Sequence, residues 1–282
     1  MNPTLRAVVE RHLALEIDAV RRIDDGWDYI VFEVNGEWIV RVPRRADVRE
    51  WFRGEAVLLE VLAEALPVRV PEPVAIEDRD LSFMVYRKLE GEPLTSALTP
   101  RHTSLARELG AFLAALHGLS PARAFAGDVV RVDWVGAREA FVRRCKVVFP
   151  LLDEDDQRRA RALFDRQRLR LPDELVVLHG DLGPEHILVR RDAVTAVIDW
   201  SDARLGDPAL DFAWLLHGPP ESFGEALLSA YAAAGGRIDA QLRDRALYFH
   251  RIGPWHEVLF GLEHGRPDMV ESGLAGVRAR LP

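Results

Sequence analysis

The sequence predicts an α+β protein of two lobes, a small one built on an antiparallel sheet with a helix and a larger, mostly helical one. Three observations predict this. Strand and hairpin signals are concentrated before residue 90, helical spacing of apolar residues dominates after it, and a Glu-Gly-Glu-Pro turn at residues 90–93 separates the two patterns. We therefore predict an N-terminal lobe at residues 1–90 and a C-terminal lobe at residues 91–282.

The N-terminal lobe is predicted to begin with an amphipathic helix over residues 1–20 and to continue into the sheet. Residues 29–34 (YIVFEV) and 37–42 (EWIVRV) are rich in β-branched and aromatic residues, and Asn35-Gly36 between them favours a tight hairpin turn. Residues 48–65 change to helical spacing, and residues 81–86 (LSFMVY) are typical of another strand. These elements would form one helix among several antiparallel strands.

The C-terminal lobe is predicted from helical spacing in several segments. Helices are expected over residues 101–116, 134–148, 153–169, 208–216, 223–234 and from 240 to the end, the last one broken at Gly253-Pro254. Two short apolar strands, at residues 175–178 and 193–198, interrupt the helices. The lobe is therefore expected to be helical around a small β element.

Composition restricts the classes of function. The 37 basic and 45 acidic residues give a net charge of −8, which disfavours a nucleic-acid surface because such proteins present a basic face. No apolar run approaches the ~20 residues needed to span a bilayer, and the charged first 20 residues are unlike a signal peptide. The single cysteine, Cys145, fits a reducing compartment. We therefore expect a cytoplasmic protein with no nucleic-acid or membrane partner.

The acidic surplus is unevenly distributed along the chain. Residues 199–271 contain 12 acidic and 6 basic residues, which gives a local charge of −6. Such a region would attract a cationic small molecule, and an acidic surface in contact only with solvent is the alternative. The charge distribution therefore favours a small, cationic binding partner.

The residues that best indicate chemistry follow the two short strands. His179-Gly180-Asp181 comes after the first strand, and Asp199 follows the second, 18 positions further on. A hairpin-like pairing of these strands would present both carboxylates at one end. A single aspartate in this setting is usually a cap or turn residue, but two aspartates with a Gly/Pro loop between them indicate one shared site.

This pattern resembles the aminoglycoside phosphotransferase family of small-molecule kinases, which have a bilobal protein-kinase-like fold. The resemblance rests on His-Gly-Asp at 179–181, Ile-Asp-Trp at 198–200 and Gly-Asp-Pro-Ala-Leu-Asp at 206–211, and it extends to Asp-Gly-Trp-Asp at 25–28 and Arg-Val-Pro-Arg-Arg at 41–45. It covers nearly the whole chain. It implies transfer of the γ-phosphate of ATP or GTP, with Mg²⁺, to a hydroxyl of an aminoglycoside; a macrolide or a metabolite is the alternative acceptor.

The resemblance also implies roles for individual residues. Asp181 would orient the acceptor hydroxyl and accept its proton, and Asp199 would hold Mg²⁺ against the nucleotide phosphates. Glu55 would pair with the basic side chain that grips these phosphates. The hinge that receives the purine, largely through backbone groups, would comprise Tyr86, Lys88 and Leu89.

Three residues depart from the family pattern. Arg41 stands where the family has its phosphate-gripping lysine, and a planar guanidinium is not equivalent to an ammonium point charge. His186 stands at the second metal-ligand position, commonly asparagine, and imidazole is a poorer match for Mg²⁺. It would ligate weakly, hydrogen-bond a phosphate or leave a single-metal site; histidine here is typical of the aminoglycoside 2″ and macrolide branches. Gly26 alone replaces a glycine-rich phosphate loop.

The acceptor site is implied to lie near residues 252–257. Its candidate residues are Asp202, Trp255, Glu257 and Glu263, of which Trp255 could instead belong to the core. Outside the acceptor site, His179 is expected to brace the loop that holds Asp181. Asp207 and Asp211 are expected to cap or anchor the helix that follows them.

Two other classes of function are compatible with parts of the sequence. The motif His179-x-Asp181 with a distant histidine is similar to the iron site of oxygenases, but that site requires a β-barrel, and this chain is helical in its second half. A nucleotide-binding protein without catalysis is the other alternative, because Arg41 and His186 replace family residues. Turnover of nucleotide that depends on Asp181 would distinguish a kinase from such a protein.

Overall fold

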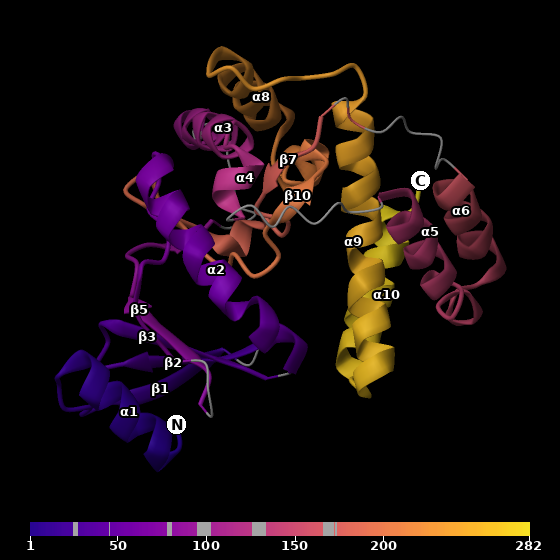
Figure 1. The fold of residues 1–282 in the computed structure, drawn as a ribbon. Coiled ribbons are helices and arrows are strands. Elements are labelled where there is room, and N and C mark those ends of the chain that lie inside the picture. Colours follow the sequence, from indigo (N-terminus) through magenta and orange to yellow (C-terminus); the bar gives the residue numbers. More distant parts are fainter. Residues whose placement is uncertain are drawn as a thin grey trace.

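The protein is described from a computed structural model. The structure describes residues 1–24, 28–44, 46–77, 81–94, 103–125, 134–165, 172 and 174–282. Figure 1 shows a small lobe built on a sheet and a larger helical lobe beside it. The predicted α+β, two-lobed, protein-kinase-like fold is confirmed. Gly26 and Arg45, which belong to the motifs quoted above, lie outside the described residues.

The small lobe contains a five-stranded antiparallel sheet in the order β1-β2-β3-β5-β4. Its elements are α1 (Pro3–Leu13), β1 (Val20–Asp24), β2 (Tyr29–Val34), β3 (Trp38–Pro43), α2 (Ala46–Ala65), β4 (Pro73–Glu77) and β5 (Phe83–Arg87). The predicted hairpin is confirmed: Asn35 and Gly36 both have positive φ, 51° and 71°. The first helix ends earlier than predicted, and β1 and β4 were not predicted, because the charges of β1 and the prolines around β4 hide the strand pattern.

Alternation of side chains along the strands places a helix on each face of this sheet (Figure 1). On β5, Phe83 packs with α1 on one face, whereas Tyr86 joins α2 on the other. On β3, Val40 lies on the α1 face. Its neighbour Arg41 therefore points toward α2, since successive side chains of a strand alternate. The buried side chain of Arg41 therefore faces α2, the helix that carries Glu55.

The large lobe contains short strands among many helices. Its elements are β6 (Glu92–Pro93), α3 (Thr103–His117), α4 (Pro121–Ala124), α5 (Trp134–Cys145), α6 (Glu154–Asp165), β7 (Val176–Leu178), β8 (Ile187–Arg190), β9 (Ala193–Val197), β10 (Arg204–Gly206), α7 (Ala213–His217), α8 (Glu221–Ala233), α9 (Leu242–His264) and α10 (Pro267–Arg280). Short 3₁₀ turns occur at η2 (Phe149–Leu151), η4 (Pro184–His186) and η5 (Pro208–Leu210). Figure 1 shows α9 and α10 side by side, with α5 and α6 next to them.

Two predictions about this lobe are wrong. The two strands that precede Asp181 and Asp199 do not pair with each other, since β7 pairs with β10 and β9 pairs with β8. The last helix is not broken at Gly253-Pro254: α9 continues through Pro254 and ends before Gly265, whose φ is 63°. A proline removes one backbone donor, and here the helix is supported by close packing of α10, whose Gly276 fits against Pro254.

The apolar core crosses the predicted boundary at residue 90. One cluster joins Phe52 and Tyr86 of the small lobe to Leu109 and Trp200 of the large lobe. A second cluster fills the space between α5, α6, α9 and α10. The division into two domains stays a prediction. Within the described ranges, the helices lack the combination of length and apolarity needed to cross a membrane.

Candidate active site

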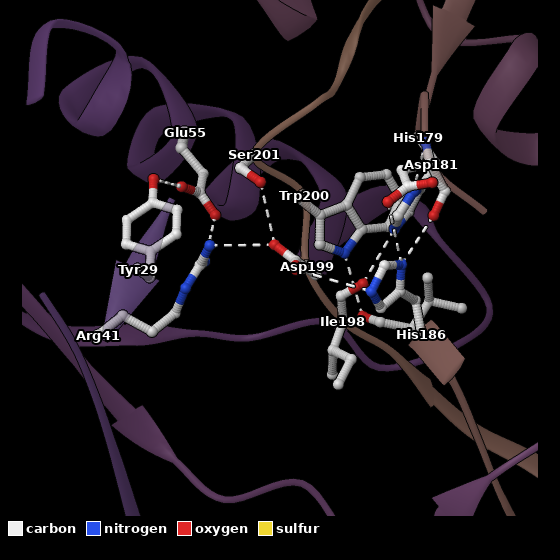
Figure 2. A network of polar contacts seen from close by, with 11 residues as sticks. Tyr29, Arg41, Glu55, His179, Asp181, His186, Ile198, Asp199, Trp200 and Ser201 are labelled. Atoms are coloured by element: carbon white, nitrogen blue, oxygen red, sulfur yellow. Dashed lines mark hydrogen bonds and ion pairs between the residues drawn. The ribbon is translucent and has the colours of Figure 1, made fainter. Parts of the chain in front are cut away.

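Side chains from both lobes meet at one place, where the sheet faces the loops of the large lobe. Figure 2 shows Arg41 of β3 and Glu55 of α2 on one side, and Asp181, His186 and Asp199 on the other. The aspartates follow β7 and β9, and His186 ends η4. These five predicted site residues therefore come together in space.

Arg41 connects the two sides of the site. Its Nη1 donates a hydrogen bond to Oε1 of Glu55 at 2.5 Å, and its Nη2 donates to Oδ1 of Asp199 at 3.1 Å. Burial by itself would lower the pKa of Arg41, but the carboxylates of Glu55 and then Asp199 raise it well above its ordinary value. The guanidinium is thus a permanent buried cation placed at the phosphate-gripping position.

Tyr29 is a member of this network that the sequence did not reveal. Its ring centroid lies 3.9 Å from Cζ of Arg41, and its hydroxyl donates to Oε2 of Glu55 at 3.0 Å. The signal that could have found it is the hairpin register. Val31 lies opposite Arg41, so Tyr29, two residues earlier on the same face, is its diagonal neighbour.

The loop that carries Asp181 requires glycine beside it. Gly180 has a φ of 88°, and a Cβ atom there would lie 2.2 Å from the backbone oxygen of Asp202. The side chain of Asp181 is 49% exposed. Despite this exposure, burial by the surrounding chain raises the pKa of Asp181 to about 6, and the nearby His186 opposes the rise. The carboxylate is accessible and close to the range of a useful base.

Asp211 holds this loop from behind. Its Oδ2 accepts from the backbone N–H of His179 and its Oδ1 from that of Gly180, both at 2.9 Å. We expected Asp211 to anchor the following helix; the structure uses it for the preceding loop, because two adjacent amides point at a fully buried carboxylate. Asp207 does cap η5, accepting from the N–H of Ala209 at 3.0 Å.

His117 extends the support behind Asp211. Its Nε2 lies 3.3 Å from Oδ2 of Asp211, and its Nδ1 lies 2.9 Å from the hydroxyl of Tyr231. His117 and Tyr231 also line a hollow of about 390 Å³. None of the residues predicted for the active site lines this hollow. His179 braces the loop as expected, through a contact of 2.9 Å between its Nε2 and the backbone oxygen of Ile198.

Asp199 is held in a strained backbone conformation. Its φ of 63° lies in the left-handed region, which residues other than glycine adopt uncommonly, aspartate and asparagine more readily than most, and which is often found at functional sites. Its Oδ1 accepts from Oγ of Ser201 at 3.0 Å as well as from Arg41. Burial pushes the pKa of Asp199 upward, but Arg41 and then His186 outweigh burial and the pKa lies below its ordinary value.

His186 lies between the two aspartates (Figure 2). Its Nδ1 is 2.8 Å from the backbone oxygen of Asp181 and 3.8 Å from Oδ2 of the same residue, and its Nε2 is 3.7 Å from Oδ2 of Asp199. Burial lowers the pKa of His186, but Asp199 and the Asp181 backbone carbonyl raise it overall. The imidazole of His186 therefore lies between the carboxylates of Asp181 and Asp199, although the strands that precede these two residues do not pair with each other.

The residues present fit a bound Mg²⁺ through one carboxylate. Asp199 has a 42% exposed side chain, and oxygen is the ligand that Mg²⁺ prefers. Among the described side chains, no group of three or more His, Cys, Asp or Glu is arranged as a ready metal site. That is compatible with Mg²⁺, which usually takes one or two carboxylates and completes its shell with water and substrate phosphates.

The predicted hinge residues differ in what they present. Leu89 packs on Leu188 and Ala196 of β8 and β9, which gives an apolar floor between the lobes. Tyr86 is buried on the face of the sheet that Arg41 shares. Lys88 uses its donors within the small lobe: its N–H donates to the carbonyl of Glu37 at 2.8 Å, and Nζ contacts Glu33 at 2.5 Å.

The acceptor candidates are only partly supported by their positions. Trp255 is fully buried and packs against aromatic rings in the core between α6 and α9, which favours the alternative that it belongs to the core over a contact with the acceptor. Glu263 is paired with Arg144 at 2.7 Å, and Glu257 lies near Arg280. Asp202 lies near enough to Asp181 to contribute to its raised pKa.

Similarity to known proteins extends over most of the chain. A model of the phosphotransferase enzyme family matches residues 19–248. A viomycin phosphotransferase from Streptomyces vinaceus is 28% identical over 266 residues, which are 84% of this chain and 82% of the relative.

Solved structures match over almost the whole length. A macrolide 2′-phosphotransferase from Brachybacterium faecium, in its apoenzyme form, is 28% identical, with a TM-score of 0.78 over 98% of both chains. The GDP complex of an aminoglycoside 2′-phosphotransferase gives a TM-score of 0.85 at 22% identity, over 99% of this chain and 98% of the other. At that identity the second likeness concerns the fold alone.

Proposed function

The chain belongs to the phosphotransferase enzyme family, and on this premise we propose that it transfers the γ-phosphate of ATP or GTP to a hydroxyl of a small molecule. One observation carries the proposal. Asp181 and Asp199 lie on either side of His186, at 3.8 and 3.7 Å from its ring nitrogens, while Arg41 reaches Asp199 from the other lobe. Phosphoryl transfer needs this combination of a base, a metal-binding carboxylate and a cation.

Asp181 is proposed to orient the acceptor hydroxyl and to accept its proton while the new phosphorus–oxygen bond forms. A carboxyl group with a pKa of about 6 is largely ionised at neutral pH and is a stronger base than an ordinary aspartate. Gly180 and Asp211 hold the loop in place, so the carboxylate does not have to be ordered when the acceptor arrives.

The donor nucleotide is proposed to lie between the lobes. Leu89 would contact the purine, with Tyr86 nearby, and Arg41, paired with Glu55, would bind the phosphates. Asp199 would hold Mg²⁺, with His186 as a weaker neighbouring ligand or a phosphate contact. Bound there, Mg²⁺ would neutralise charge on the transferring phosphate. The engaged donors of Lys88 support only an indirect role for that residue.

The acceptor is proposed to be an antibiotic, with an aminoglycoside first and a macrolide second. The −6 charge of residues 199–271 favours a cation, but the structure narrows that argument, since Asp207, Asp211 and Asp239 are all bound to protein groups. Asp202, Glu257 and Glu263 remain as candidates for a cationic acceptor because none of them is buried, and the ion pairs of Asp202 with Arg204 and of Glu263 with Arg144 are exposed. The 28% identity to a macrolide 2′-phosphotransferase supports the second candidate.

A product screen tests the proposal. Purified protein with Mg²⁺ and either ATP or GTP would be incubated with an aminoglycoside, a macrolide, viomycin or a simple amino alcohol. Mass spectrometry would detect an acceptor that has gained one phosphate group. The Asp181→Asn variant is the control, and it should bind nucleotide without making product. Nucleotide binding with no product from any acceptor would favour the non-catalytic alternative.

A further inference from the structure

The guanidinium of Arg41 is contacted in two different ways. Its Nη1 and Nη2 make the ion pairs with Glu55 and Asp199, whereas its Cζ lies over the ring of Tyr29, 3.9 Å from the ring centroid. A guanidinium is planar, and its donors lie in that plane. The ion pairs alone leave the tilt of the plane adjustable, and the ring on its face restricts that tilt. The direction in which Nη2 points toward the inter-lobe site therefore depends on Tyr29.

Tyr29 also binds Glu55, the carboxylate that pairs with Arg41. Its hydroxyl donates to Oε2 of Glu55 at 3.0 Å, while Oε1 of the same carboxylate accepts from Arg41. One residue thus fixes both the guanidinium and the acid that pairs with it. Burial and the adjacent Glu55 raise the pKa of Tyr29 far above its ordinary value, which favours the neutral phenol as the donor in this contact.

We infer that Tyr29 is a positioning residue for the donor phosphates, which acts by holding the guanidinium of Arg41 in the plane that lets it bind them. The inference rests on the proposed function and adds a residue that none of the sequence motifs contains. A lysine at position 41 would offer a point charge with rotatable donors, whereas an arginine needs its plane set by a neighbour. Tyr29 supplies that neighbour in this chain.

A purely structural role is the competing explanation, because Tyr29 is buried and its ring lies 6.3 Å from that of Phe52 in the same cluster. The two explanations differ in which ligands they affect. Loss of core packing would weaken every ligand of the site alike. Loss of positioning would weaken only ligands that carry phosphate.

The experiment compares a nucleotide with its nucleoside. Affinities for ATP and adenosine, or for GTP and guanosine, would be measured by calorimetry without acceptor, for the wild type, Tyr29→Phe and Tyr29→Leu. Removing a desolvated cation–π contact should weaken binding of the triphosphate about tenfold in Tyr29→Leu. Tyr29→Phe, which keeps the ring, should show a smaller loss. Nucleoside affinity should change less than about twofold, since a nucleoside has no phosphate for Arg41 to hold.

Phe52→Leu is the matched control for packing, because it trims a buried ring in the same cluster without touching Arg41. Urea unfolding would show its loss of stability, and its affinities for triphosphate and nucleoside should match those of the wild type. In an Arg41→Met background, Tyr29→Leu should cause no further loss of triphosphate affinity. These results together would support the inference.

Equal losses of triphosphate and nucleoside affinity in Tyr29→Leu would overturn the inference and assign Tyr29 to the core. A full tenfold loss that persists in the Arg41→Met background would do the same, because it could not act through the guanidinium. A wild-type protein that binds neither triphosphate would overturn the proposed function, and this inference with it. Failure of the inference alone is therefore distinguishable.

Discussion

The two halves of the candidate site are held by different means. In the small lobe, the side chains of Arg41 and Glu55 are each 4% exposed and form a direct ion pair. In the large lobe, the side chains of Asp181 and Asp199 are 49% and 42% exposed, and His186 approaches their carboxylates no closer than 3.7 Å. Position in the first half comes from buried side chains in contact. In the second half the backbone positions the loop of Asp181, and Asp199 is held both by its backbone conformation and by hydrogen bonds from Arg41 and Ser201.

In the large-lobe half, several features of the backbone fix the positions of aspartates whose side chains are partly exposed. Gly180 has positive φ, Asp199 is left-handed, and Asp211 binds two consecutive amides. Because the backbone fixes their positions, the side chains of Asp181 and Asp199 can remain accessible to substrate. We therefore expect effects on stability and on activity to separate. Changes in the small-lobe half should reduce the free energy of unfolding most, and changes to the exposed carboxylates should reduce the reaction rate most.

The largest expected effect is on rate. Asp181→Asn should lower kcat about 1,000-fold, because a carboxamide cannot accept the hydroxyl proton. The free energy of unfolding should not fall, since the side chain is half exposed and folding disfavours the ionised form of a carboxylate whose pKa is raised by burial. Steady-state kinetics and urea denaturation measure the two quantities. A loss of several kcal/mol of stability in this variant would contradict the expectation that changes in the large-lobe half affect rate more than stability.

The next largest effect is on stability. Glu55→Ala should lower the free energy of unfolding by about 3 kcal/mol, because it removes one partner of a buried ion pair and leaves Arg41 undercompensated. Glu64→Ala is the matched control on the same helix; its pair with Arg123 is 74% and 54% exposed and should contribute less than about 1 kcal/mol. Equal losses in urea denaturation would mean that burial does not distinguish these pairs.

Asp211→Asn should fall between the two classes. The amide group can replace one acceptor oxygen but turns a donor toward the other backbone N–H, which costs about 2 kcal/mol for a buried group. Because those amides belong to the loop of Asp181, kcat should fall as well, even under conditions where the variant is fully folded. Thermal unfolding and kinetics on one preparation would check this. Unaltered kcat would show that Asp211 supports only the fold.

The smallest effect is expected at an exposed ion pair. Glu263→Gln should change the free energy of unfolding by less than about 1 kcal/mol, since both members of its pair with Arg144 are at least half exposed. Its KM for a cationic acceptor should change less than that of Asp202→Asn, because Asp202 lies near Asp181. If Glu263→Gln changed KM more than Asp202→Asn did, the acceptor would be inferred to bind near the end of α9.

Local signals in the sequence predicted much of the fold. Asn35-Gly36 predicted the hairpin, and apolar spacing predicted α2, α3 and α8 to within a few residues, whereas the first helix was predicted to residue 20 and ends at Leu13. The strand pairing was wrong because β7 and β9 are only three and five residues long, and such short strands carry no register of their own. The break at Pro254 was wrong because packing against a distant helix outweighed a local helix-breaking signal.

The sequence by itself determined which chemical groups exist and their order along the chain: two aspartates after short strands, a histidine between them, and an arginine on a strand followed by a glutamate on a helix. Only the tertiary structure decided that Tyr29 covers the face of Arg41, that Asp211 supports the loop of Asp181, and that Trp255 is internal. The physical reason is that composition and periodicity act over a few residues. Contacts between residues far apart in sequence depend on how all elements pack at once.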